Sequence, residues 1–170
     1  MIKNITDNIK PMTKEELEEI DYIDLALSDL KGNTYKVTKP VKYWCQNMMV
    51  GKWKMYDKKG TLVAEADIDS VTVYPGYVWD GCTVIGLVYE DKYTLQASLL
   101  HDILYEVLAV RGYKPVFSSY QADYWFTQLI KILSGYKVLP EVYRAALAVL
   151  GTPFRKLVGK KTTYTIKAKD

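Results

Sequence analysis

The strongest constraint on the fold is a change of hydrophobic period about halfway along the chain. Between residues 34 and 80, apolar residues alternate with Lys or Thr, which is the period of strands with one buried face. From 94 to 151 the apolar residues recur at helical spacing instead. Strands followed by helices, with no βαβ alternation, predict an α+β fold. The alternating pairs are Tyr35/Val37, Val41/Tyr43 and Trp53/Met55.

Turn and capping residues divide the two regions into elements. Residues 57–60, Asp-Lys-Lys-Gly, predict a hairpin turn in which Gly60 takes a positive φ, and Pro75-Gly76 interrupts the sheet again. We therefore expect an antiparallel sheet of about four to six strands, followed by a C-terminal set of about three helices. The expected helices run from an N-cap at Thr94 to Gly112, from a capping box of Ser118 and Gln121 to Gly135, and from Pro140 to Gly151.

The two ends of the chain read differently from the middle. Residues 1–12 resemble a loose arm, and a capping box of Thr13 and Glu16 then predicts an amphipathic N-terminal helix that ends at Gly32. Near the other end, 162–168 alternate like an edge strand inside a basic tail, for which an anionic partner is the alternative to simple solvation. The expected organisation is an arm and helix over 1–33, one α+β domain over 34–155 and the tail over 156–170.

Composition excludes several classes of protein. The net charge of +3, from 23 basic and 20 acidic residues, is no strong signal for nucleic-acid binding. No stretch is long and apolar enough to span a membrane, and the N-terminus shows no secretion signal. Cys45 and Cys82 have no metal-ligand spacing and are expected as free thiols in a reducing compartment.

The candidate site centres on the only histidine of the chain, His101. It lies with Asp102 and Tyr105 in the apolar helical run 94–105, where polar groups oppose burial unless partners satisfy them. The short connection to the next helix predicts that Asp123 faces His101 or Tyr105. A carboxylate on one imidazole nitrogen fixes the tautomer and leaves the other nitrogen as a base. This arrangement is typical of a hydrolase that activates water.

A loop is expected to complete the site. Asp102 lies on the flank of its helix, where its carboxylate is available to a hard cation such as calcium. Asp80-Gly81 favours a turn that exposes backbone groups, and Cys82 and Thr83 follow it directly. Zinc is not expected, because one histidine and two separated cysteines do not supply a tetrahedral set.

The motifs together resemble a domain family of unknown function that is widespread in tailed phages and prophages. The match covers about residues 70–155 and departs from the family at Cys82, where alanine is usual, and at 84–86, where Val-Ile-Gly stands in place of the common Pro-Arg. The resemblance implies a phage gene product, found in the virion or in the host cytoplasm during infection, but no activity. Its motifs are Gly76–Thr83, Ala97–Tyr105, Ala122-Asp123-x-x-Phe126 and Tyr143-Arg144-Ala145 ahead of Gly151.

The pair of helices is also similar to the catalytic core of phospholipases A2. That resemblance implies a lipid or ester hydrolase in which His101 is the general base, Asp102 binds calcium and Asp123 orients the histidine with help from Tyr105. The glycine-rich calcium loop and the disulfides of those enzymes have no clear equivalent here.

Other interpretations remain open. The alternative for the network of His101, Asp123 and Tyr105 is a structural anchor that fixes helix pairing. The protein would then be a non-catalytic virion, tail-associated or assembly protein that contacts other phage structural proteins, or a small effector that binds a host factor. A nucleophilic Cys82 paired with His101 is a further alternative.

Overall fold

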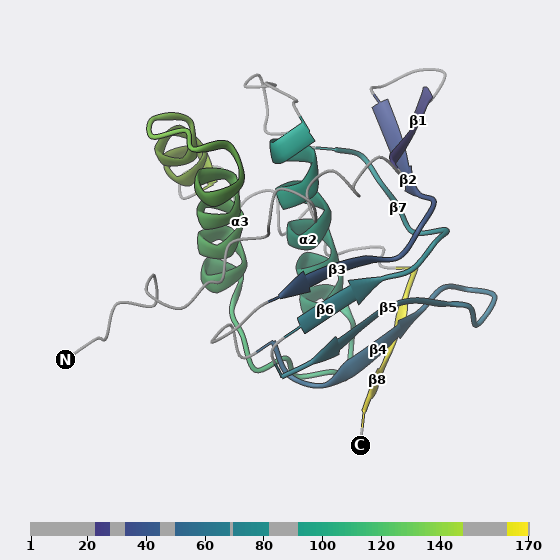
Figure 1. Ribbon diagram of the computed structural model, residues 1–170. Coiled ribbons are helices and arrows are strands. Elements are labelled where there is room, and N and C mark those ends of the chain that lie inside the picture. Colours follow the sequence, from purple (N-terminus) through teal and green to yellow (C-terminus); the bar gives the residue numbers. More distant parts are fainter. Residues whose placement is uncertain are drawn as a thin grey trace.

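The computed structural model describes residues 23–27, 33–44, 50–68, 70–81, 92–147 and 163–169. Within these ranges the chain forms two antiparallel sheets, packed with helices from the C-terminal half (Figure 1). The predicted α+β class is confirmed, and the segment 33–79 holds six strands, at the upper end of the expected number.

The larger sheet has five strands in the order β3-β6-β5-β4-β8. Alternation places one side chain of each pair inward, so that Tyr43, Val71, Ala66 and Trp53 align in register and are almost fully buried. Its strands are β3 (Val41–Trp44), β4 (Trp53–Tyr56), β5 (Leu62–Asp67), β6 (Ser70–Val73) and β8 (Thr165–Ala168).

The predicted hairpin turn joins β4 to β5. The Oδ1 atom of Asp57 accepts hydrogen bonds from the backbone N–H groups of Lys59 and Thr61, both at 2.8 Å. Gly60 takes a φ of 80°, a left-handed conformation that glycine adopts without steric strain. The turn chemistry of 57–60 is therefore confirmed.

The smaller sheet, in the order β1-β2-β7, corrects the expected N-terminal helix. Residues Ile23–Leu27 form strand β1, which pairs with β2 (Asn33–Val37), and β2 pairs in turn with β7 (Val78–Trp79). Apolar residues at 23, 25 and 27 also fit the two-residue period, and pairing with a neighbouring strand decided between the two periods. The arm over 1–12 and the capping box of Thr13 and Glu16 lie outside the described residues.

The C-terminal edge strand is confirmed. Strand β8 pairs antiparallel with β4, with Lys54 opposite Lys167 and Met55 opposite Ile166. The backbone N–H of Lys169 donates to the carbonyl of Lys52 and extends this pairing. The two sheets thus include β1 and β8, which lie outside the range 34–155 expected for the domain.

The predicted helices form, but α2 begins and ends two residues earlier than expected. Helix α2 spans Lys92–Ala109, so Thr94 is a buried residue inside the helix and not its N-cap. Helix α3 (Ser119–Ser134) has the predicted capping box of Ser118 and Gln121, and Gly135 ends it with a φ of 70°. A third helical run covers 139–147, with Pro140 in its first turn; Gly151 lies outside the described residues.

The elements form three layers, with α2 in the middle (Figure 1). The apolar side of α2, with Leu99, Leu100 and Ile103, joins the core of the sheets. Helix α3 lies beside α2 and antiparallel to it, on the side of α2 away from the five-stranded sheet. The third run contributes Tyr143, which packs against Phe126 of α3. The face that α2 turns toward α3 carries His101.

Candidate functional site

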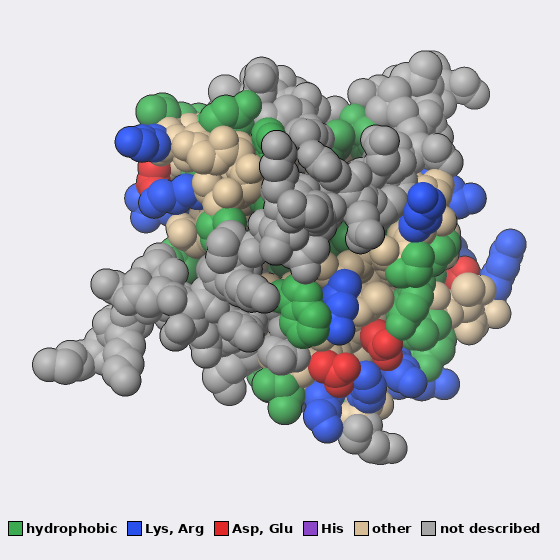
Figure 2. All heavy atoms as spheres, in the orientation of Figure 1, with side chains coloured by type: hydrophobic (Ala, Val, Ile, Leu, Met, Phe, Trp, Pro, Cys, Tyr) green, Lys and Arg blue, Asp and Glu red, His purple; other side chains and the backbone are tan. Residues whose placement is uncertain are grey.

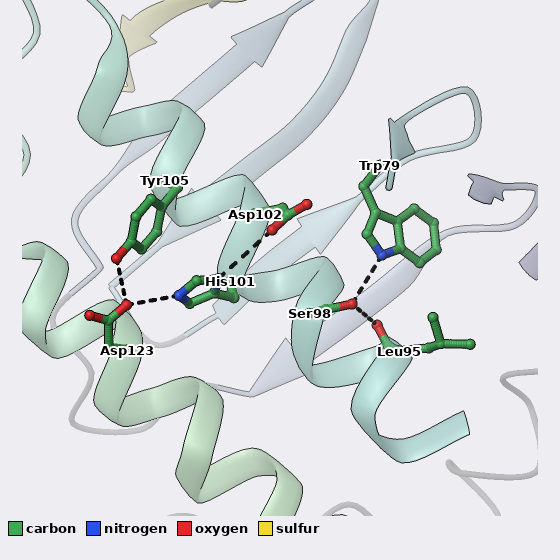
Figure 3. Close-up of polar contacts among 7 residues, drawn as sticks. All are labelled: Trp79, Leu95, Ser98, His101, Asp102, Tyr105 and Asp123. Carbon is green, nitrogen blue, oxygen red and sulfur yellow. Dashed lines mark hydrogen bonds and ion pairs between the residues drawn. The ribbon is translucent and has the colours of Figure 1, made fainter. Parts of the chain in front are cut away.

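Three polar side chains from two helices meet where α2 and α3 touch (Figure 3). The Nε2 atom of His101 lies 2.9 Å from Oδ1 of Asp123, and the hydroxyl of Tyr105 donates to the same oxygen at 2.5 Å. His101 and Tyr105 are four residues apart, so helical geometry places both on one face. The predicted meeting of His101, Tyr105 and Asp123 is therefore observed.

Aromatic rings hold the imidazole in place. The His101 ring centroid lies 4.4 Å from that of Tyr105 and 4.9 Å from that of Phe126. Phe126 in turn packs edge-on against Tyr143, with centroids 5.5 Å apart. The His101 side chain keeps 14% of its surface exposed, so the imidazole is fixed on most sides and still reaches solvent.

The contacts define the tautomer of His101 and shift its pKa. Because the Asp123 carboxylate only accepts hydrogen bonds, the neutral imidazole carries its proton on Nε2, and Nδ1 has the lone pair. Burial by itself lowers the pKa of His101, but the contacts with Asp102 and Asp123 raise it further than burial lowers it. The net result is a pKa above the usual 6.5.

Asp102 lies on the other side of the imidazole. Its Oδ1 atom is 3.8 Å from Nδ1 of His101, which is too long for a direct hydrogen bond. Burial raises the pKa of Asp102 from 3.8 to about 6, against the lowering effect of His101, and the negative charges of Asp80 and Glu106 add to the rise. A carboxylate whose pKa is raised in this way is of the kind often found at functional sites.

The end of strand β7 is tied to α2 next to the site. The indole N–H of Trp79 donates to Oγ of Ser98 at 3.1 Å, and that hydroxyl donates to the carbonyl of Leu95 at 2.8 Å (Figure 3). The bond places Asp80, which is exposed, close to the turn of α2 that carries Asp102. Gly81 takes a φ of 75°, as the predicted turn requires.

The other two loop residues of the predicted site, Cys82 and Thr83, lie outside the described residues, and the Cys82 nucleophile stays a prediction.

Metal ligands do not gather in the described ranges. Within them, no group of three or more His, Cys, Asp or Glu side chains is arranged to hold a metal ion. The fit of Asp102 to calcium therefore rests on one carboxylate and its neighbour Asp80, and we assign the ion no step in the chemistry.

Among the described residues, no helix has the length and apolarity needed to cross a membrane.

Two contributors to the site were not anticipated. The Trp79–Ser98 bond joins residues 19 positions apart and needs the fold to be seen. The role of Glu106 could have been predicted from the sequence, since it follows Asp102 by four residues and so lies on the same helix face.

No family model, curated protein or solved structure matches this chain.

Proposed function

We propose that this chain is a hydrolase in which His101 is the general base, acting on a lipid or another ester. The observation that carries the proposal is the 2.9 Å contact between Nε2 of His101 and Asp123, which leaves Nδ1 as the basic nitrogen. The resemblance of the motifs to a family from tailed phages supports a phage gene product. The similarity of the helix pair to phospholipases A2 supports an ester bond as the target.

The proposed reaction begins with a water molecule between Nδ1 of His101 and Oδ1 of Asp102. Two acceptors 3.8 Å apart suit a water that donates one hydrogen to each. Nδ1 takes a proton as the water oxygen attacks the ester carbonyl carbon, which forms a tetrahedral intermediate. The imidazolium then returns that proton to the departing alkoxide, so the products are an acid and an alcohol and the histidine is restored.

Asp123 and Tyr105 stabilise the charged intermediate of this cycle. The imidazolium that forms at His101 is paired with the Asp123 carboxylate, and the Tyr105 hydroxyl fixes that carboxylate through the same oxygen. Rings at 4.4 and 4.9 Å prevent the imidazole from turning away. Asp123 and Tyr105 are therefore positioning residues, and His101 is the catalytic residue.

The experiment compares hydrolysis by the wild type, His101→Asn and Tyr105→Phe on a panel of short-chain esters and phospholipid vesicles, with and without calcium. We expect His101→Asn to lose activity by at least about a hundredfold, the scale of general-base catalysis. Tyr105→Phe should retain part of the activity. Melting temperatures serve as the control for folding. Absence of hydrolysis by the wild type on every substrate would overturn the proposal.

A structural anchor is the second candidate, and burial favours it. Asp123 is only 8% exposed and accepts two hydrogen bonds, so the network by itself can specify how α2 and α3 pair. The protein would then be a virion, tail-associated or assembly component, or an effector of a host factor. This candidate predicts that His101→Asn lowers the melting temperature strongly, that no substrate is hydrolysed, and that the protein co-purifies with phage particles or a host partner.

A further inference from the structure

The outer face of the five-stranded sheet presents lysines and aromatic rings together. Helix α2 covers the inner face, and none of the described helices lies over the outer one (Figure 1). Lysine side chains gather there around a central pair of acidic side chains (Figure 2). The lysines come from positions that the sequence scatters widely, namely Lys42, Lys52, Lys54, Lys167 and Lys169.

The strand register aligns three of these lysines, Lys42, Lys54 and Lys167, in one row. Lys42 lies opposite Thr72, Thr72 opposite Glu65, Glu65 opposite Lys54 and Lys54 opposite Lys167. The row crosses all five strands, a distance of about 19 Å at the usual spacing between strands. It therefore has a lysine at each end, with Lys54 next to Lys167 and Glu65 in the middle.

Two lysines lie over aromatic rings of the same face. Nζ of Lys42 is 4.1 Å from the ring centroid of Trp44, and Nζ of Lys167 is 5.1 Å from that of Tyr56. Trp44 is 44% exposed, an unusual position for so large an apolar side chain. A cation beside an exposed ring can neutralise a phosphate while the ring stacks on a base.

The acidic residues of this face are already engaged. Nζ of Lys169 lies 2.9 Å from Oδ2 of Asp67 and 3.4 Å from Oε2 of Glu65, and the hydroxyl of Tyr74 donates to Glu65 at 2.6 Å. The described residues of this face include five lysines and these two carboxylates, so positive charges outnumber negative charges. The face is thus complementary to an anionic chain.

We infer that the outer face of the five-stranded sheet binds single-stranded nucleic acid, with Lys42 and Lys167 on the phosphates and Trp44 and Tyr56 as stacking platforms. The surface is independent of the proposed hydrolase site, which lies between α2 and α3 on the other side of the sheet. For a lipid substrate, which rests on the proposed function, that opposition also argues against a membrane as the partner, because a bilayer on this face would hold His101 away from the lipid. The row is long enough for a few nucleotides, the lower end of sites on other sheet surfaces.

The test measures fluorescence anisotropy of a labelled oligothymidylate of about 12 nucleotides at about 50 mM salt and above. We expect Lys42→Gln and Lys167→Gln each to weaken binding several-fold and to reduce the slope of log Kd against log salt by about 0.7, the value for one phosphate of a single strand. Trp44→Ala should weaken binding about fivefold or more, the lower end of base–aromatic stacking.

Lys131→Gln is the matched control, because Lys131 is an exposed lysine on α3, away from the sheet face. It should leave binding unchanged, and all variants should melt close to the wild type since the altered side chains are exposed or at the sheet surface. Absence of oligonucleotide binding, equal losses in the control, or binding only to anionic phosphatidylglycerol vesicles would each overturn the inference. Oligonucleotide binding with ester hydrolysis absent would uphold it and reject only the proposed function.

Discussion

Replacing Asp102 by asparagine should stabilise the protein at neutral pH. The pKa of Asp102 rises from 3.8 to about 6 on folding, with burial as the main cause. Each pH unit corresponds to about 1.4 kcal/mol, so the ionised carboxylate destabilises the folded state by about 3 kcal/mol. Solvent reaches 30% of the side chain and screens part of this, which leaves about 2 kcal/mol for Asp102→Asn to recover.

The stability difference between Asp102→Asn and the wild type should depend on pH, in the direction set by the raised pKa of Asp102. Below 3.8 the carboxyl group is protonated in both the folded and the unfolded chain, so the substitution changes little. As the pH rises through 3.8 to about 6, only the unfolded chain ionises readily, and the wild type loses stability relative to the variant. Above that window the full difference of about 2 kcal/mol should persist.

Urea unfolding followed by tryptophan fluorescence, with a chelator present, measures the free energy of unfolding at each pH. Asp67→Asn is the control of opposite sign, because its hydrogen bond with Lys169 lowers the pKa of Asp67. That variant should be no more stable than the wild type at pH 7. If Asp102→Asn leaves the stability at pH 7 unchanged or reduces it, the claim that the ionised Asp102 carboxylate destabilises the folded state is wrong.

Three further outcomes are expected. Tyr105→Phe removes a hydrogen bond to a carboxylate and should lower the free energy of unfolding by about 1–2 kcal/mol in urea titrations. Ser118→Ala removes the N-cap of α3 and should lower it by about 1 kcal/mol while leaving any hydrolysis unchanged, as a combined melting and activity assay would show. Because folding raises the pKa of His101, its contribution to stability should be present below 6.5 and fall as the pH rises through the folded-state value; a stability profile parallel to that of His101→Asn would contradict this.

Local chemistry made much of the fold predictable. The capping box of Ser118 and Gln121 and the turn at 57–60 depend on neighbours in sequence, and both form as predicted. Strand β1 was missed because its residues fit both periods, and only pairing with β2 distinguishes them. The start of α2 was missed because a threonine in a favourable sequence context resembles a cap even when the helix begins before it.

The same distinction between local and long-range contacts applies to the candidate site and to the lysine row. Helical spacing placed His101 and Tyr105 together, and a short connection placed Asp123 opposite them. The lysine row of the sheet was not predictable, because it depends on β8 pairing with a strand more than a hundred residues earlier. Net charge averages over the whole chain and hides a surface assembled in this way.

The most direct test of the central claim is the tautomer of His101, measured by nitrogen NMR across a pH titration. The chain has one histidine, so its imidazole signals need no assignment by mutation. We predict a neutral imidazole protonated on Nε2, with a bare Nδ1 and a pKa above 6.5 that falls in Asp123→Asn. A neutral form protonated on Nδ1, or a pKa below 6.5, would contradict the claim that Asp123 prepares this histidine as a base.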